Sequence, residues 1–160
     1  MAEGKYKRPY LDSSVFLAAI NEENERAEIV RQVLDAADKG LIQIVASTFV
    51  VTEVIRIKGE SGYLTEDKES AINQILTSDK ILFVELDLTL AFEARRLARV
   101  HNLKVVDAVH LASAFRAKAD ILFRYDNRFT TVPVLPELQL CDPYWHGDVP
   151  FAGSELDVPL

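Results

Sequence analysis

The sequence predicts an α/β domain with a mainly parallel central sheet flanked by helices. Two observations favour this fold class. Short apolar runs rich in β-branched residues alternate along the chain with longer segments whose apolar residues recur at helical spacing. Strands separated by helices in this way form parallel sheets with helices on both faces. The length of 160 residues is also enough for one domain that buries a proper core.

The first half of the chain contains a predicted strand over residues 8–11, helices over 15–20 and 21–39, a strand over 41–46 and a helix over 47–59. Asp12 follows the first strand and offers a cap for the helix after it. Gly40 supplies the stop for the longer amphipathic helix. Ser47 and Thr48 then begin a new helix after the second strand.

The second half contains a predicted helix over residues 66–78, a strand over 81–86, a helix over 89–101, a helix that Asp107 opens and a strand over 121–125. Asp87 is the expected cap of the helix over 89–101, and Asn102 is its expected end. Asp107 precedes a strongly apolar segment, where a carboxylate can cap free backbone N–H groups and lies well in the helix dipole.

From Pro133 onward the regular spacing is lost, and no further strand or helix is predicted. We therefore expect a domain over residues 1–135 followed by a proline-rich C-terminal extension over 136–160. Tyr144, Trp145 and Phe151 lie in this extension, and such large aromatic side chains indicate that part of it packs on the domain or on a partner.

Composition and charge exclude several classes of function. A net charge of -7 argues against binding nucleic acid by bulk electrostatic attraction. No apolar stretch approaches the roughly 20 residues that span a bilayer, so we expect no membrane role. The single cysteine, Cys141, excludes an intramolecular disulfide and a cysteine-based zinc site, which favours a cytoplasmic protein.

Three carboxylates, Asp12, Glu53 and Asp126, lie at or near the ends of predicted strands, and a fourth, Asp107, opens a helix. Since ligands of parallel sheets bind at the carboxyl ends of the strands, these side chains can converge on one edge. Two carboxylates about 4 Å apart repel by about 4 kcal/mol at an effective dielectric constant near 20. A cation would relieve this repulsion, and ligation by oxygen alone favours Mg²⁺ or Mn²⁺. A structural role, such as capping, is the alternative for each residue taken alone.

Four stretches, taken in order, carry a resemblance to a known family. They are Tyr10-Leu11-Asp12-Ser13-Ser14-Val15, Ser47 with Glu53 six residues on, Asp107-Ala108-Val109-His110-Leu111-Ala112-Ser113-Ala114, and Tyr125-Asp126-Asn127-Arg128-Phe129. Together they resemble PIN-domain nucleases, and most closely the VapC-type ribonuclease toxins of toxin–antitoxin pairs. The resemblance spans about residues 8–135 and implies the three-layer PIN-like fold.

The resemblance also implies an activity, which is Mg²⁺- or Mn²⁺-dependent endoribonuclease cleavage of RNA phosphodiester bonds with water as the nucleophile. The implied catalytic residues and metal ligands are Asp12, Glu53, Asp107 and Asp126, with Ser14 as a nearby polar helper. The family often places a small hydroxyl residue two positions before the last acid, where this chain has Arg124. A protein antitoxin is implied by the family alone.

Four basic residues near the acidic stretches are the candidates for RNA contact: Arg116, Lys118, Arg124 and Arg128. The arginines over residues 95–99 are more typical of a solvated helix face. His110, three residues after Asp107, can orient a ligand or touch substrate. A packed or capping histidine is the commoner case, so we leave His110 out of the catalytic set.

Two other functions remain open at this point. One is a PIN-like binding module whose acidic pocket holds a partner or metal with little turnover. The other is an RNA-processing nuclease without a toxin role. The apolar helix faces also favour a homodimer, since most soluble oligomers are symmetric assemblies of one chain.

Overall fold

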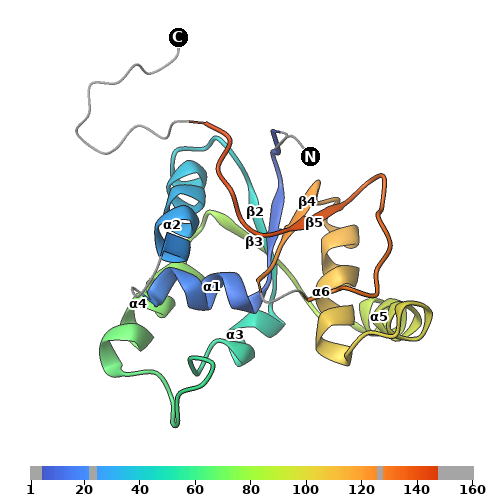
Figure 1. Ribbon diagram of the computed structural model, residues 1–160, viewed down its shortest axis with the longest axis horizontal. Helices are drawn as coiled ribbons and strands as arrows, with labels where there is room; N and C mark the ends of the chain where they lie inside the picture. The colour runs from blue at the N-terminus through green and yellow to red at the C-terminus, as the bar shows by residue number, and fades with distance from the viewer. Residues whose placement is uncertain (1–4, 22–24, 126–127, 148–160) are drawn as a thin grey trace.

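The structure is a computed structural model, and it describes residues 5–21, 25–125 and 128–147. Within these ranges a central sheet lies between two layers of helices (Figure 1). The strands are β1 (Pro9–Leu11), β2 (Ile44–Ser47), β3 (Ile81–Val84), β4 (Ile121–Phe123) and β5 (Gln139–Cys141). The helices are α1 (Ser13–Ile20), α2 (Glu25–Asp38), α3 (Phe49–Glu53), α4 (Glu66–Leu76), α5 (Leu88–His101) and α6 (Val105–Arg116).

The strands of the sheet are all parallel and follow the order β3-β2-β1-β4-β5. β1 is the central strand, where Tyr10 pairs with Val45 of β2 on one side and with Leu122 of β4 on the other. Parallel neighbours need crossover connections, and most of these connections contain helices, as the alternating pattern indicates. The prediction of an α/β domain with a mainly parallel sheet is confirmed.

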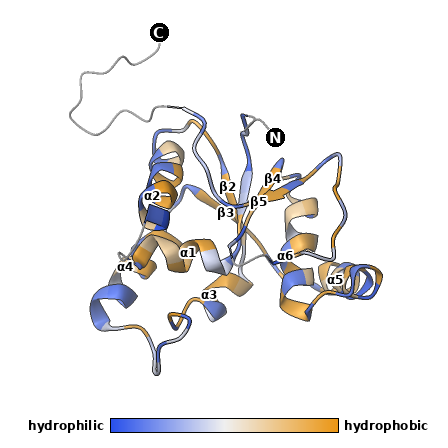
Figure 2. Ribbon diagram, viewed as in Figure 1, coloured by the Kyte–Doolittle hydropathy of each residue, from blue (hydrophilic) through white to orange (hydrophobic). Residues whose placement is uncertain are grey.

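The two faces of the sheet pack in two separate cores, because successive strand residues point to opposite faces. Tyr10 and Leu122 pack with the helices α5 and α6. Leu11 and Phe123, their neighbours in sequence, pack with α1, α2 and α4. α5 carries both hydrophobic and hydrophilic residues (Figure 2), as expected for a helix with one buried side.

Several helix ends lie at the predicted cap residues. Asp12 is the N-cap of α1 and accepts a hydrogen bond of 3.0 Å from the Ser14 N–H. Asp87 caps α5 in the same way, through a bond of 2.8 Å from the Leu90 N–H. Asn102 ends α5 in the left-handed conformation, with φ at 50°, which asparagine adopts more readily than most residues.

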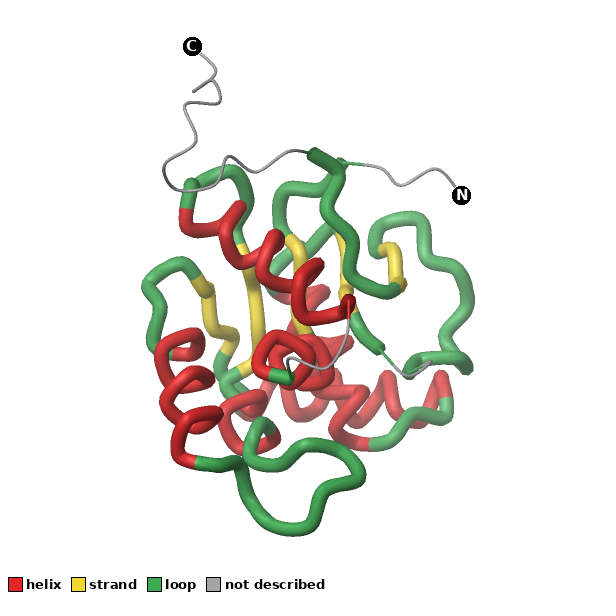
Figure 3. Tube along the Cα trace, turned by 60° about the vertical axis from the view of Figure 1, so that its left-hand side comes forward, coloured by secondary structure: helices red, strands yellow, loops and turns green. Residues whose placement is uncertain are grey.

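α3 is shorter than the helix predicted over residues 47–59. It ends at Glu53, and residues 54–65 form turns and loop (Figure 3). Residues 50–54 are β-branched except for Glu53, and β-branched side chains crowd the preceding turn of a helix and lower its stability. Glu53 therefore lies at the end of a short helix, and the expectation that it lies early in the helix is wrong.

α6 begins before Asp107. Its first residue is Val105, its N-cap is Lys104, and no side chain makes a capping hydrogen bond there. The capping role expected for Asp107 is therefore wrong, because Asp107 is itself inside the first turn. A negative charge in the first turn still interacts favourably with the helix dipole.

β5 lies in the segment after Pro133, where no regular element was predicted. Gln139–Cys141 pairs in parallel with β4, and Leu140 lies beside Leu122. A strand this short has too few residues to show a periodicity of its own. β5 joins the start of the extension predicted over residues 136–160 to the sheet.

The residues after β5 contact the N-terminal segment before β1. The Tyr6 hydroxyl donates a hydrogen bond of 2.6 Å to the Tyr144 carbonyl oxygen. Edge-to-face contacts also join the Tyr6 ring to the rings of Phe123, Tyr144 and Trp145. Packing on the domain is thus confirmed for Tyr144 and Trp145, while Phe151 lies outside the described residues.

None of the helices in the described ranges is long and apolar enough to cross a membrane.

Candidate active site

The carboxyl ends of the strands bring three of the four predicted acids to one edge of the sheet. Asp12 directly follows β1, Glu53 ends the helix after β2, and Asp107 lies in the first turn of α6. Asp126 lies outside the described residues.

A single arginine joins two of these acids. Arg128 Nη1 lies 3.7 Å from Asp12 Oδ2 and 3.6 Å from Asp107 Oδ1. The guanidinium group therefore contacts both carboxylates at once. The site thus places two acids around one positive charge, which is the arrangement that carboxylates adopt around a cation.

Asp12 is fully buried. Its Oδ1 accepts hydrogen bonds from the backbone N–H and the hydroxyl of Ser14. Its Oδ2 is also buried and has no hydrogen-bond partner among the described residues. Burial raises the pKa of Asp12, and His110, Ser14 and Arg128 oppose that shift. A buried carboxylate oxygen without a donor is a suitable ligand for a cation.

Ser14 lies where the sequence predicted a polar helper. Its hydroxyl donates to Asp12 Oδ1 and accepts a hydrogen bond of 3.0 Å from the Tyr125 N–H. Through this second bond, Ser14 links Asp12 to Tyr125, which lies two residues after β4. Ser14 thereby fixes the orientation of the Asp12 carboxylate relative to the sheet.

Glu53 is held through both of its carboxylate oxygens. His110 Nε2 lies 2.6 Å from Oε1, and the Ser13 hydroxyl donates to Oε2 at 3.1 Å. Arg128 Nη1 in turn donates to the Ser13 hydroxyl oxygen at 3.5 Å. The surroundings of Glu53 and of Asp12 are therefore connected through Ser13 and Arg128.

The four candidates for RNA contact lie in different places. Arg128 is at the acidic site, as described above. Arg116 donates to Asp87 at 2.7 Å and Arg124 to Asp142 at 2.6 Å, so each is in an ion pair away from the acids. Lys118 is exposed just after α6. Among these four, the structure brings Arg128 alone to the acids.

The donors at the site are compatible with a small divalent cation. Mg²⁺ in proteins is commonly held by one or two carboxylates and several waters, and Asp12 and Asp107 supply two carboxylates at one point. Within the described residues, no group of three or more His, Cys, Asp or Glu side chains lies close enough to hold a metal ion. Asp12 and Asp107 therefore fit a cation that is bound through two carboxylates and completed by water. Asp126 lies outside the described residues.

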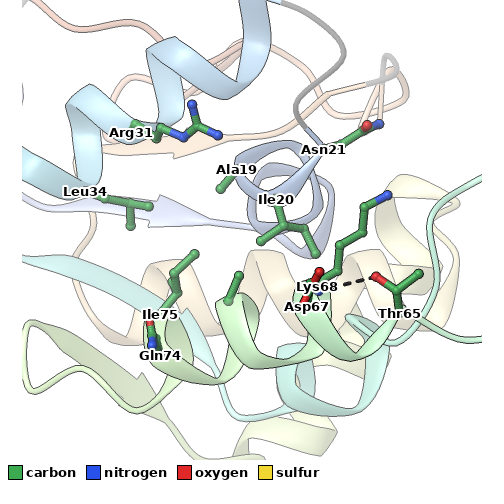
Figure 4. Close-up of a pocket in the computed structure, with 11 residues that line it drawn as sticks. Ala19, Ile20, Asn21, Arg31, Leu34, Thr65, Asp67, Lys68, Gln74 and Ile75 are labelled. Carbon is green, nitrogen blue, oxygen red and sulfur yellow. Dashed lines mark hydrogen bonds between the residues drawn. The ribbon is translucent and has the colours of Figure 1, made fainter.

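A separate pocket of about 700 Å³ lies at the other end of α1 (Figure 4). It is lined by the end of α1, by α2 and by α4, with Ile20, Leu34 and Ile75 among its apolar residues. Asp12, Glu53 and Asp107 do not line it. The position of this pocket therefore does not identify the acidic site.

Three residues around Glu53 were outside the predicted site: Ser13 and His110 bond its carboxylate, and Tyr10 bonds His110. The sequence did carry a signal for His110, since it lies three residues after Asp107 and hence on the same face of α6. Tyr10 carries no such signal, because its contact with His110 joins residues 100 positions apart.

The sequence matches the model of the PIN domain family over residues 10–135. The chain therefore belongs to the PIN domain family, and the predicted resemblance is confirmed. No curated protein matches the chain in sequence.

Several solved structures share the fold. The VapC20 toxin of Mycobacterium tuberculosis, a sarcin-ricin loop cleaving toxin, is 16% identical with a TM-score of 0.61, over 79% of this chain and 96% of that one. VapBC2 of Rickettsia felis, bound to a DNA fragment from its promoter, is 16% identical with a TM-score of 0.61, over 85% and 98%. A toxin–antitoxin complex from Klebsiella pneumoniae is 15% identical with a TM-score of 0.56, over 81% and 94%. Identities this low establish the fold alone.

Proposed function

We propose that this chain is a Mg²⁺- or Mn²⁺-dependent endoribonuclease. The observation that carries the proposal is the convergence of Asp12 and Asp107 on one positive charge, with Asp12 Oδ2 buried and lacking a hydrogen bond in the described part of the chain. Membership of the PIN domain family and the similarity to the cleaving toxin VapC20 support the nuclease class.

In this proposal Asp12 and Asp107 hold the cation through their carboxylate oxygens, and Glu53 and Asp126 complete the acidic set. When bound, the cation supplies Lewis-acid activation of water and of the phosphodiester. Ser14 keeps Asp12 in its orientation through the Oδ1 bond. The protein needs no nucleophile of its own, because its acids serve to bind and orient.

Binding of RNA by a chain with a net charge of -7 must depend on local cations. We propose Arg128 as the phosphate contact closest to the acids, since it is one-third exposed beside them. Arg116, Lys118 and Arg124 complete the proposed set, although Arg116 and Arg124 would first leave their carboxylate partners.

Purified protein incubated with structured RNAs, with and without EDTA, tests the proposal. We expect cleavage with added Mg²⁺ or Mn²⁺, none with EDTA, and a loss of at least about a hundredfold in Asp107→Asn, because several kcal/mol of transition-state stabilisation are removed. Asp35→Asn, an equivalent change on the surface of α2, serves as the control. Cleavage that persists in EDTA or in Asp107→Asn would contradict the proposal.

A binding module with little turnover is the second candidate. The observation in its favour is Arg128, which already neutralises Asp12 and Asp107 within the protein. Binding of Mn²⁺ without cleavage of any RNA in the same assay would favour this candidate over the enzyme.

We further propose that the enzyme acts in the cytoplasm as the toxin of a toxin–antitoxin pair. The similarity of its fold to a VapC toxin and to two toxin–antitoxin assemblies supports this role. Induced expression should arrest growth, Asp107→Asn should not, and co-expression of a small protein encoded beside this gene should relieve the arrest. Growth unaffected by the active enzyme would favour an RNA-processing nuclease.

A homodimer is also part of the proposal. α5 exposes Leu88, Phe92 and Val100, which are 74%, 64% and 62% exposed, and exposed apolar side chains that lie together mark interaction surfaces. Light scattering of the purified chain would decide between a monomer and a dimer.

A further inference from the structure

A buried chain of hydrogen bonds leads from β2 to the carboxylate of Glu53. The Ser47 N–H donates to the Tyr10 hydroxyl oxygen at 3.1 Å. The Tyr10 hydroxyl lies 2.6 Å from His110 Nδ1, and His110 Nε2 lies 2.6 Å from Glu53 Oε1. Ser47, Tyr10 and His110 are fully buried. The chain therefore links two strands and α6 to the end of α3.

The protons in this chain can be assigned from its contacts. An ionised carboxylate is an acceptor and not a donor, so His110 must carry a proton on Nε2 to bond Glu53. In the neutral ring Nδ1 is then an acceptor, and the Tyr10 hydroxyl is the donor facing it. Each bond of the chain thus has one donor and one acceptor.

Glu53 needs this support, because its own helix gives it little. α3 has five residues, and a helix this short has little stability of its own. The Glu53 side chain is 16% exposed and has several rotatable bonds whose ordering costs free energy. Bonds from His110 to Oε1 and from Ser13 to Oε2 fix its rotamer while leaving lone pairs on both oxygens for a cation.

The bond between His110 and Glu53 also joins α6 to α3. α3 lies between the two cores, with Val50 in one and Phe49 packed against the other, which contains α5 and α6. His110 therefore fixes the Glu53 side chain relative to α6, the helix that also carries Asp107. Ligands to metals are commonly oriented by a second set of hydrogen bonds in this way.

We propose that His110 is a positioning residue, held by Tyr10, that orients the Glu53 carboxylate toward the cation site at Asp12 and Asp107. The inference rests on the proposed function, since Glu53 needs this orientation if the site holds a cation. It assigns to His110 a role beyond that of a buried side chain whose hydrogen bonds are satisfied.

The first test measures the affinity of the full chain for Mn²⁺ by calorimetry. We expect about ten- to hundredfold weaker binding in His110→Leu, which removes the donor to Glu53 and keeps an apolar side chain in the core. His110→Gln places an amide N–H near the position of Nε2, so most of the affinity should return. Tyr10→Phe should weaken binding by a smaller factor, because the donor to Glu53 remains but loses its support.

Tyr6→Phe is the matched control for Tyr10→Phe. It also removes a hydroxyl from a buried tyrosine with a hydrogen bond of 2.6 Å, but this bond goes to the Tyr144 carbonyl oxygen and not to His110. If the effect on Mn²⁺ came from lost stability in general, the two variants would weaken binding equally. We expect Tyr6→Phe to bind Mn²⁺ as the wild type does.

The second test examines the metal-free protein by NMR of ¹⁵N-labelled histidine. We expect the neutral His110 ring to carry its proton on Nε2, and Glu53→Gln to shift that signal. A neutral ring protonated on Nδ1 would overturn the proposed chain of bonds. This measurement does not depend on metal binding or cleavage.

The outcomes separate this inference from the proposed function. Wild-type affinity and RNA cleavage in both His110→Leu and Tyr10→Phe would overturn the inference and leave the nuclease proposal standing. A wild type that neither binds Mn²⁺ nor cleaves RNA would overturn the proposed function and, with it, the orientation of Glu53 toward a cation.

Discussion

The two carboxylate oxygens of Asp12 have different roles. Oδ1 caps α1 and bonds Ser14, which is a structural role. Oδ2 is buried without a hydrogen bond in the described part of the chain and faces Arg128. One side chain therefore begins a helix and carries a buried charge that costs stability. Such a cost is typical of residues retained for function.

Asp12→Asn should make the protein more stable. Asparagine keeps the cap acceptor of α1 and removes the buried charge, so we expect the free energy of unfolding to rise by about 1 kcal/mol at neutral pH. Mn²⁺ binding should be lost in the same variant. Urea denaturation with and without Mn²⁺ measures both effects, and an Asp12→Asn protein less stable than the wild type would contradict this account.

The pH dependence of this gain has a definite sign. Burial raises the pKa of Asp12 in the folded protein above its ordinary value of 3.8. At pH values above the raised pKa the charge is present in both folded and unfolded chains, and its burial costs stability. As the pH falls through the raised pKa, the folded protein takes up the proton first and the cost disappears. The advantage of Asp12→Asn should therefore be present above the raised pKa of Asp12 and shrink as the pH falls through it.

Arg128→Gln should have the opposite effect on the metal-free protein. It leaves Asp12 and Asp107 without the guanidinium group that lies 3.7 and 3.6 Å from them. We expect a loss of about 1 kcal/mol, less than for a fully buried pair, because Arg128 is one-third exposed. Added Mn²⁺ should then raise the melting temperature more than in the wild type. An equal rise in melting temperature in Arg128→Gln and the wild type would show that Arg128 does not compete with the cation.

At the scale of elements, the predictions were right for helix ends that a single capping residue determines. Asp12, Asp87 and Asn102 mark helix ends in the sequence and in the structure, since capping depends on local chemistry. The end of α3 and the strand β5 could not be predicted in this way. α3 stops within a β-branched segment, and β5 forms because β4 lies beside it, which the local sequence does not encode.

Asn102 gives the test at this scale. Its φ of 50° is unfavourable for residues with a Cβ atom, and asparagine tolerates it better than alanine does. Asn102→Ala should lower the free energy of unfolding by about 1 kcal/mol, whereas Asn102→Gly should leave it unchanged or raise it slightly. Urea denaturation of both variants checks this, and equal stabilities would show that α5 ends differently in solution.

At the scale of the whole molecule, the sequence predicted the sheet and the acids but not the contacts between layers. Asp12 and Glu53 were predictable because each follows or lies near the end of a strand, and Asp107 because it lies at the start of a helix. His110 was left out because a packed or capping histidine is the commoner case, and its bond to Glu53 joins residues 57 positions apart. Contacts of this kind depend on the complete packing of the domain.

The predicted boundary at residue 135 can be tested directly. A chain that ends there lacks β5, the buried Leu138 and the Tyr144 that bonds Tyr6. Each large apolar side chain contributes about 1.5–3 kcal/mol on burial, so the loss approaches the total stability of a typical domain. We expect this chain to unfold at a much lower temperature than one ending at residue 147. Circular dichroism during heating measures both melting temperatures. Equal melting temperatures would support residues 1–135 as a domain that folds by itself.

The central place of β1 in the sheet has a consequence for synthesis of the protein. Tyr10 pairs with Val45 on one side and with Leu122 on the other, so β1 leaves the ribosome long before its second neighbour does. Contacts between such distant parts of a chain form slowly. A growing chain therefore holds Asp12 from an early stage, yet it cannot place Asp12 beside Asp107 until α6 has emerged, nor complete the sheet around β1 until β4 has followed. The proposed site is therefore assembled only after α6 and β4 have emerged, although the first of its acids is made early.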